Sequence, residues 1–255
     1  MSEDISAEEK QQLSDIMKSA ADSSAQYLID KITDKDAFQR LLRPEGNLAR
    51  FIAEKCLELS RGRYAGEEVA SNYGYYSGYT KPRPASDQID ILRSHWPQLN
   101  PDPVIKYMRD VYLRLQLPNW VEGAFVIIRR GYFSDQYGEE VVELFKALSK
   151  DRKGKFYNDY EGRMGPEYLR QNEATLAMLA RLMEQQPDSD LLMLPAQFGI
   201  RFRGRSVRRV REIYTNGEFG LGTKDSGTML LTHDNRLRAT RDLSVDLAGD
   251  KIFNS

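Results

Sequence analysis

Arginine is concentrated near the end of the chain, and its spacing there points to anion binding. No acidic residue interrupts a run of six arginines: Arg201, Arg203, Arg205, Arg208, Arg209 and Arg211. A guanidinium group binds two phosphate oxygens through parallel N–H donors and also stacks on the face of a base. We therefore predict that this segment contacts the phosphates of nucleic acid or another polyanion, with an affinity that falls steeply with salt.

The charge of the chain is strongly polarised although its total is only −1. Residues 201–241 contain ten basic and four acidic side chains, a charge of +6, which leaves −7 on the rest. Residues 1–40 carry −4 of that. The arginines can therefore pair instead with acidic helices of their own chain or of a neighbouring subunit, and a specific anionic small ligand is a third alternative.

Five of the 14 tyrosines lie between residues 64 and 79, in a segment containing Gly and Ser. Such residues indicate a loop, and loops lie at the surface. Tyr75, Tyr76 and Tyr79 are therefore expected to stack on bases beside the arginines. The alternatives are an adaptable protein-binding surface and a loop folded down so that its rings fill a groove between helices.

Few residues have the spacing that acid–base or metal chemistry needs. The only histidines, His95 and His233, each fall at the end of a predicted helix, where a structural role is expected. Asp242, Asp246 and Asp250 recur every four residues, and such carboxylates can bind Mg²⁺, but no nuclease motif accompanies them. We expect a binding protein without cofactor or metal, and keep a metal-dependent enzyme on a phosphorylated substrate as an alternative.

Two further motifs have structural explanations. Cys56 lies in an apolar stripe between Ile52 and Leu59, so we predict a buried thiol and not a nucleophile. As the single cysteine, it also excludes an internal disulfide. The Gly217–Gly222 segment lacks the order of residues in a nucleotide-binding loop, and no clear strand precedes it, so it predicts a turn between two helices.

Most of the chain that positions these residues has helical spacing. A capping box at Ser6-Ala7-Glu8-Glu9 opens the first helix. Helices are predicted over 6–32, 47–59, 86–95, 102–115 and 134–148, and from Pro166 to residue 183. Ala124–Ile128 is apolar on every side, which predicts a short central helix, with a β-strand as the alternative.

The pattern changes after the polar residues 185–190. Ile200–Arg205 alternates as an extended segment would, helical spacing follows from Ser206, and Leu243–Leu247 alternates like a strand. We therefore predict a mainly α fold. It has a multi-helix, bundle-like body over residues 1–186 and a small Arg-rich α+β element over 187–255, alternatively packed on the body as one domain.

The sequence also gives expectations for location and assembly. The first residues are acidic with no apolar stretch after them, and the longest apolar runs have five residues, against roughly 18 for a membrane span. We expect a cytoplasmic protein that does not enter a membrane. The apolar stripe of the first helix would pack on its own domain or on a second subunit, so a homo-oligomer through that helix is an alternative.

Overall fold

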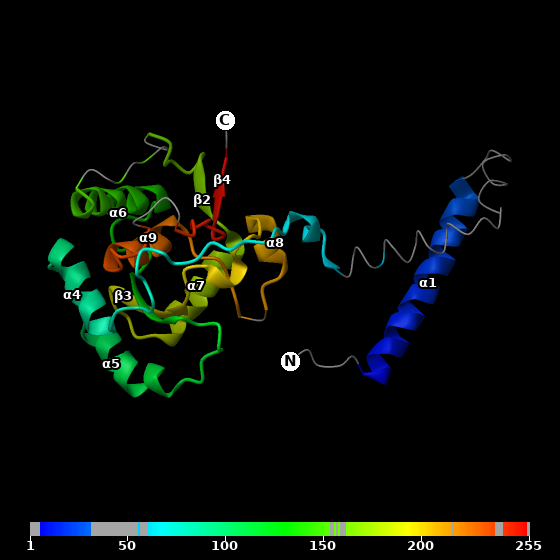
Figure 1. Ribbon diagram of the computed structural model, residues 1–255, viewed down its shortest axis with the longest axis horizontal. Coiled ribbons are helices and arrows are strands. Elements are labelled where there is room, and N and C mark those ends of the chain that lie inside the picture. The colour runs from blue at the N-terminus through cyan, green and yellow to red at the C-terminus, as the bar shows by residue number, and fades with distance from the viewer. Residues whose placement is uncertain are drawn as a thin grey trace. The chain divides into compact units, whose positions relative to one another are not determined.

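The computed structural model describes residues 6–31, 56, 61–153, 156, 158, 162–215, 217–237 and 242–253 (Figure 1). The chain divides into two compact units, Met1–Arg61 and Gly62–Ser255. Among the described residues, seven α-helices accompany four short strands. The prediction of a mainly α protein is confirmed.

The described part of the first unit is essentially one helix, α1 (Ala7–Lys31). It begins where the capping box predicts, and Leu13 and Ile16 of its apolar stripe are exposed. The predicted helix over 47–59 lies outside the described residues except for Cys56, which is helical and partly buried. Among all the described helices, none combines the length and apolar composition needed to cross a bilayer.

Two antiparallel strands form the centre of the second unit. β1 (Gly123–Ile128) pairs with β3 (Leu191–Ala196), with Phe125 opposite Leu194 and Ile128 opposite Leu191. The central helix predicted over 124–128 is therefore wrong, and the strand alternative is correct. A strand that is covered on both faces is apolar throughout, so its sequence loses the alternation that would distinguish it from a buried helix.

Helices cover both faces of this sheet. Successive side chains of a strand point to opposite sides, so each strand contributes to two hydrophobic clusters. Val126, Ile128 and Met193 face one hydrophobic cluster, whereas Phe125 and Ile127 face the other. The surrounding helices are α4 (Ala85–His95), α5 (Asp102–Asp110), α6 (Tyr137–Asp151), α7 (Glu173–Gln185) and α9 (Thr223–Thr232). Helix α9 packs against β1 and lies beside α6 (Figure 1).

Two buried glutamines complete the hydrogen bonding of the sheet at its outer edges. Gln88 of α4 donates to the carbonyl of Ala124 (2.9 Å) and accepts from the N–H of Val126 (2.8 Å). Gln186, just after α7, donates to the carbonyl of Met193 (2.8 Å) and accepts from its N–H (2.9 Å). Val126 and Met193 lie opposite each other in the sheet, so each glutamine bonds to one residue of this cross-strand pair, and Gln88 also bonds to Ala124.

The remaining strands are short. β2 (Leu169–Gln171) pairs with β4 (Asp250–Ile252). Each of the two sheets therefore pairs a strand of the predicted body, residues 1–186, with a strand of the predicted C-terminal element, residues 187–255. The helix predicted from Pro166 begins only at Glu173, because residues 169–171 form β2. No strand forms over Leu243–Leu247; the strand follows it, at β4.

The extended segment predicted over 200–205 is also wrong. Gly199 adopts a left-handed conformation (φ +96°) and turns the chain into a 3₁₀-helix, η3 (Ile200–Phe202). Helix α8 (Val207–Glu212) then begins as predicted, and the Ser206 hydroxyl accepts from the N–H of Arg209 at its N-terminus. The local turn geometry at glycine thus prevails over the alternating pattern.

Replacing Gln186 by Leu should destabilise the second unit by about 3 kcal/mol, because the N–H and carbonyl of Met193 would be buried without partners. Chemical denaturation followed by circular dichroism measures this change. Gln185→Leu, at an exposed neighbouring position, is the matched control and should change the unfolding free energy by less than about 0.5 kcal/mol. Equal losses of unfolding free energy in the two variants would contradict this role of the Gln186 side chain.

Candidate functional site

The arginine segment, residues 201–211, is joined to an acidic 3₁₀-helix near the start of the second unit, η1 (Ala65–Glu67). The N–H of Val69 donates to the carbonyl of Gly204 at 2.7 Å, and Glu68 bridges to Arg205 in antiparallel orientation. Gly204 has φ +75°, and a Cβ there would lie 2.1 Å from the carbonyl oxygen of Val69. Only glycine permits this close approach.

Glutamates pair with most of the six arginines. Arg205 and Arg209 both contact Glu68, at 3.2 and 2.5 Å, and Arg209 also contacts Glu212 at 2.9 Å. Hydrogen bonding from Arg209 lowers the pKa of Glu68 below its usual value. The remaining pairs are Arg208 with Glu67 and Arg201 with Glu218.

The other two arginines differ in their surroundings. Arg211 donates to the carbonyls of Ala248 (2.9 Å) and Asp250 (2.6 Å), which attaches α8 to the C-terminal segment. Arg203 is exposed, and the one hydrogen bond of its side chain among the described residues is a long one, 3.5 Å, to the carbonyl of Tyr73. Arg203 and the 65% exposed Arg208 therefore carry the positive charge that this segment presents to solvent.

The three predicted stacking tyrosines occupy different environments. Tyr79 is 2% exposed and donates to Glu122 at 2.9 Å. Tyr75 also donates to Glu122 and packs edge-on against Tyr79, with ring centroids 5.2 Å apart. Burial raises the pKa of both hydroxyls. These two rings fill the interior, as the folded-down loop alternative describes, and Tyr76, 51% exposed, is the one whose ring lies at the surface.

An arginine that the charge pattern does not distinguish from the others lies in the core. Arg236 is fully buried, and its guanidinium carbon is 4.4 Å from the centroid of the Tyr75 ring. It donates to the carbonyl of Leu243 at 2.7 Å. Burial lowers its pKa. Sequence spacing gives no signal for this placement, because the tyrosine ring that it packs against is 161 positions away.

His233 is a structural residue. Its Nε2 accepts from the N–H of Arg83 (3.0 Å) and its Nδ1 contacts the carbonyl of Met229 (2.8 Å), so the neutral ring with a proton on Nδ1 satisfies both nitrogens. Burial lowers the pKa of His233 to about 4. His95 ends α4, as predicted.

The three candidate metal-binding aspartates do not converge. Asp242 accepts from Ser77, Asp246 is exposed, and Asp250 accepts from the hydroxyl of Tyr137 and the N–H of Thr223, at 2.9 and 2.7 Å. Among the described residues no group of three His, Cys, Asp or Glu side chains has a metal-binding arrangement. Residues 217–222 connect α8 to α9, consistent with the predicted turn.

Sequence reasoning also missed a buried charge cluster at the start of α9. Lys224 is 1% exposed, and its Nζ lies 3.2 Å from Oε1 of the equally buried Glu140. Beside it, Asp225 accepts from the side-chain amide of Gln171 at 3.1 Å, and burial raises the pKa of Asp225 to about 6. These groups bind one another and line none of the larger cavities of the described structure.

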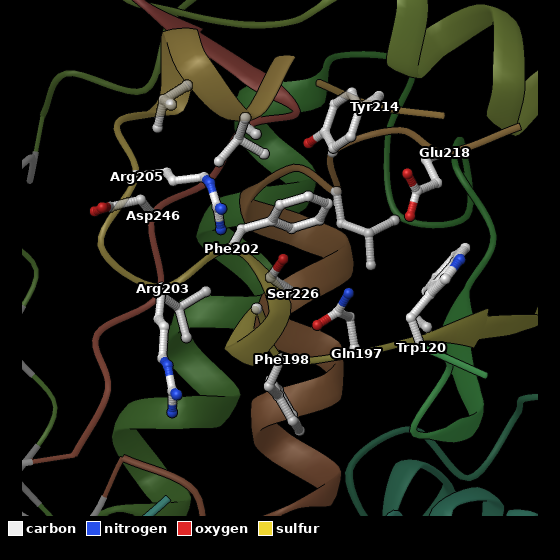
Figure 2. Close-up of a pocket in the computed structure, with 18 of the residues that line it drawn as sticks. Trp120, Gln197, Phe198, Phe202, Arg203, Arg205, Tyr214, Glu218, Ser226 and Asp246 are labelled. Atoms are coloured by element: carbon white, nitrogen blue, oxygen red, sulfur yellow. The ribbon is translucent and has the colours of Figure 1, made fainter. Parts of the chain in front are cut away.

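The main concave feature is a cavity of about 880 Å³ between the arginine segment, the end of β3, helices α7 and α9, and residues 242–248. Its walls are mostly apolar and include six aromatic side chains: Tyr73, Trp120, Phe198, Phe202, Tyr214 and Phe219. Figure 2 shows Phe202, Gln197 and Ser226 in the middle of the cavity, with Trp120 and Glu218 on one side and Arg205 and Asp246 on the other. Its lining comes from segments far apart in sequence, which is why no motif predicts it.

One uncharged buried donor in the wall of this cavity lacks a hydrogen-bond partner among the described residues. The Nε2 of Gln197 is buried without a hydrogen bond, although its Oε1 accepts from the N–H of Arg201 at 3.1 Å. The hydroxyl of Ser226, on α9, faces the same space (Figure 2). A buried donor without an acceptor is costly, so such groups in a cavity wall are positioned to bind something.

The chain matches no known protein-family model, and no curated protein or solved structure is similar enough to count as a match. The geometry of the cavity and of the arginine segment is therefore what indicates a function for this protein.

The difference in unfolding free energy between the wild type and a His233→Gln variant should shrink by roughly 3 kcal/mol as the pH falls from 7 to 4. The folded-state pKa of about 4 lies below the ordinary value of 6.5, so the unfolded chain binds the extra proton in that interval. Denaturant titrations at several pH values measure this. The same comparison with His95→Gln, at a half-buried ring, should give a smaller change. A difference that stays constant with pH would contradict a neutral buried His233.

Proposed function

We propose that this protein binds a small, mainly apolar molecule in the cavity beside the arginine segment. The observation that carries the proposal is the cavity itself, about 880 Å³ with aromatic walls and an unpaired amide donor from Gln197. Small-molecule sites typically have volumes of about 300–1,000 Å³, apolar walls and a few fixed polar groups. Of the acid–base and metal candidates of the sequence, His233 and Asp250 have partners outside the cavity, whereas Asp242 and Asp246 line it without converging on a metal-binding arrangement.

In this proposal the arginines build the wall of the cavity. Arg205 lines it, and Arg208 and Arg209 pair with Glu67 and Glu68 on the facing segment. Isolated exposed ion pairs contribute little to stability, but a connected set that shares Glu68 fixes geometry. This supports the alternative in which the basic segment docks on acidic residues of its own chain, here within the second unit.

Binding of the uncharged dye Nile red tests the proposal. The wild type should bind one dye saturably, with enhanced fluorescence. Ser226→Phe, which adds a ring inside the cavity, should weaken binding by at least about tenfold, because the ring occupies ligand volume. Ser149→Phe adds the same ring at an exposed site on α6 and serves as the control.

Circular dichroism and a thermal melt show whether the Ser226→Phe variant is folded. The proposal fails if the wild type does not bind the dye, or if a folded Ser226→Phe variant binds it as tightly as the control does. The smaller Ser226→Ala variant leaves the cavity open and should bind the dye within about threefold of the wild type.

Polyanion binding, most plausibly to nucleic acid, is a second candidate. The observation in its favour is that Arg203 and Arg208 present guanidinium groups to solvent, while Tyr73 and Tyr76 are about half exposed. Exposed arginines with neighbouring aromatic rings are the usual elements of a single-strand surface. The pairing of the other arginines leaves such a surface with fewer phosphate contacts than the sequence alone suggests.

Fluorescence anisotropy with a labelled single-stranded oligonucleotide tests this candidate. Arg203→Glu combined with Arg208→Glu should weaken binding at least about tenfold at low salt, since each reversal replaces an attraction to phosphate by a repulsion. Arg93→Glu, at an exposed position on α4, reverses one charge elsewhere and should leave binding nearly unchanged. Unaltered affinity in the double variant, or no binding by the wild type at low salt, would eliminate it.

A further inference from the structure

We infer that the ligand of this cavity is an uncharged, ring-containing molecule whose hydrogen-bond acceptor binds the Gln197 amide. The inference rests on the proposed cavity function and specifies its ligand class. Three features carry it: the charges around the cavity, the polar groups inside it, and the aromatic walls.

Of the six charged side chains that line the cavity, three are in ion pairs, Asp242 accepts from Ser77, and Arg203 and Asp246 are exposed to solvent. Arg205 contacts Glu68, Glu67 contacts Arg208, and Glu218 contacts Arg201. Glu218 is only 3% exposed and also accepts from the N–H and hydroxyl of Thr215, both at 2.7 Å. An ionised ligand placed among these groups would lose its hydration without gaining a free counter-charge.

The net charge of the lining also disfavours an anion. Its arginines are Arg203 and Arg205, whereas its acidic residues are Glu67, Glu218, Asp242 and Asp246. The formal charge of the lining is therefore −2, in contrast to the +6 of residues 201–241. A phosphate or carboxylate ligand, which the arginine-rich sequence suggests, would thus meet more negative than positive charge.

Among the uncharged polar groups in the wall of the cavity, the Gln197 amide has a defined direction. Because Oε1 of Gln197 accepts from the N–H of Arg201, its Nε2 is the end left to donate. A carbonyl or ether oxygen of a ligand would satisfy this donor, and the Ser226 hydroxyl faces the same space (Figure 2). A single neutral donor does not compensate for the lost hydration of a full charge, which favours a neutral acceptor at this position.

The walls indicate the shape of the apolar part. Trp120, Phe202 and Tyr214 come from three different segments and line the cavity together with Gln197 (Figure 2). Aromatic side chains pack well against flat rings by stacking or edge-on contacts. An aromatic or alicyclic ring that bears one carbonyl group matches these walls and the Nε2 donor of Gln197.

Competition against bound Nile red by a matched series of naphthalenes tests the inference. Methyl 2-naphthoate is uncharged with a carbonyl, 2-naphthoate is the anion, 2-naphthylmethylammonium is the cation, and 2-ethylnaphthalene lacks an acceptor. The ester should compete at least about tenfold better than either ion, because only the ions must give up the hydration of a full charge.

Gln197→Glu tests the role of the amide, since it retains the acceptor for the N–H of Arg201 and removes the Nε2 donor. It should weaken the ester about fivefold to tenfold and leave 2-ethylnaphthalene unchanged within about twofold. Gln197→Leu, which removes the donor without adding a charge, should have the same selective effect and serves if the first variant does not fold.

The possible failures are distinguishable. If the wild type does not bind Nile red, the cavity function and this inference both fall. If Nile red binds but naphthoate or the ammonium compound competes better than the ester, the cavity function stands and an uncharged ligand is wrong. Equal loss of ester and 2-ethylnaphthalene in both Gln197 variants would overturn the amide as the group that selects the ligand.

Discussion

The sheet at the centre of the second unit has only two described strands, and two glutamine side chains bond to backbone groups on its outer sides. Val126 and Met193, opposite each other across β1 and β3, are held on their outer sides by the amides of Gln88 and Gln186. A glutamine amide carries both a donor and an acceptor, so one side chain can replace a neighbouring strand at one residue. Two-stranded sheets are marginal alone, and this pair is stabilised by the helices that supply the glutamines.

The position of the cavity follows from this arrangement. The end of β3 supplies Leu194 and Ala196 to the lining, and the chain continues directly into Gln197 and the arginine segment. Because β3 is fixed on both sides, the turn at Gly199 and the segment after it begin from a rigid base. The Arg–Glu pairs then hold that segment against residues 67–69, and the space between them stays open.

The sequence predicts the amphipathic helices well, because their periodicity and caps are local: the starts of α1, α5 and α8 fall at or within a residue of the predicted positions. It fails at Ala124–Ile128, where a doubly covered strand and a buried helix have the same composition. It identifies the arginines as a group but not their partners, since Glu67 and Glu68 lie about 140 positions away. Neither Gln197 nor Ser226 could be found, because nothing in their neighbouring residues indicates a shared cavity.

Helix α8, only six residues long, contacts both ends of the second unit. Arg209 binds Glu68, near the first residue of the unit, while Arg211 binds the carbonyls of Ala248 and Asp250, near the last. Domains generally fold as units while the chain is being synthesised. The second unit therefore cannot close until β4 has left the ribosome. Strand β1 also precedes its partner β3 by a long stretch of chain, so the nascent chain exposes the apolar edge of β1 until β3 has been synthesised.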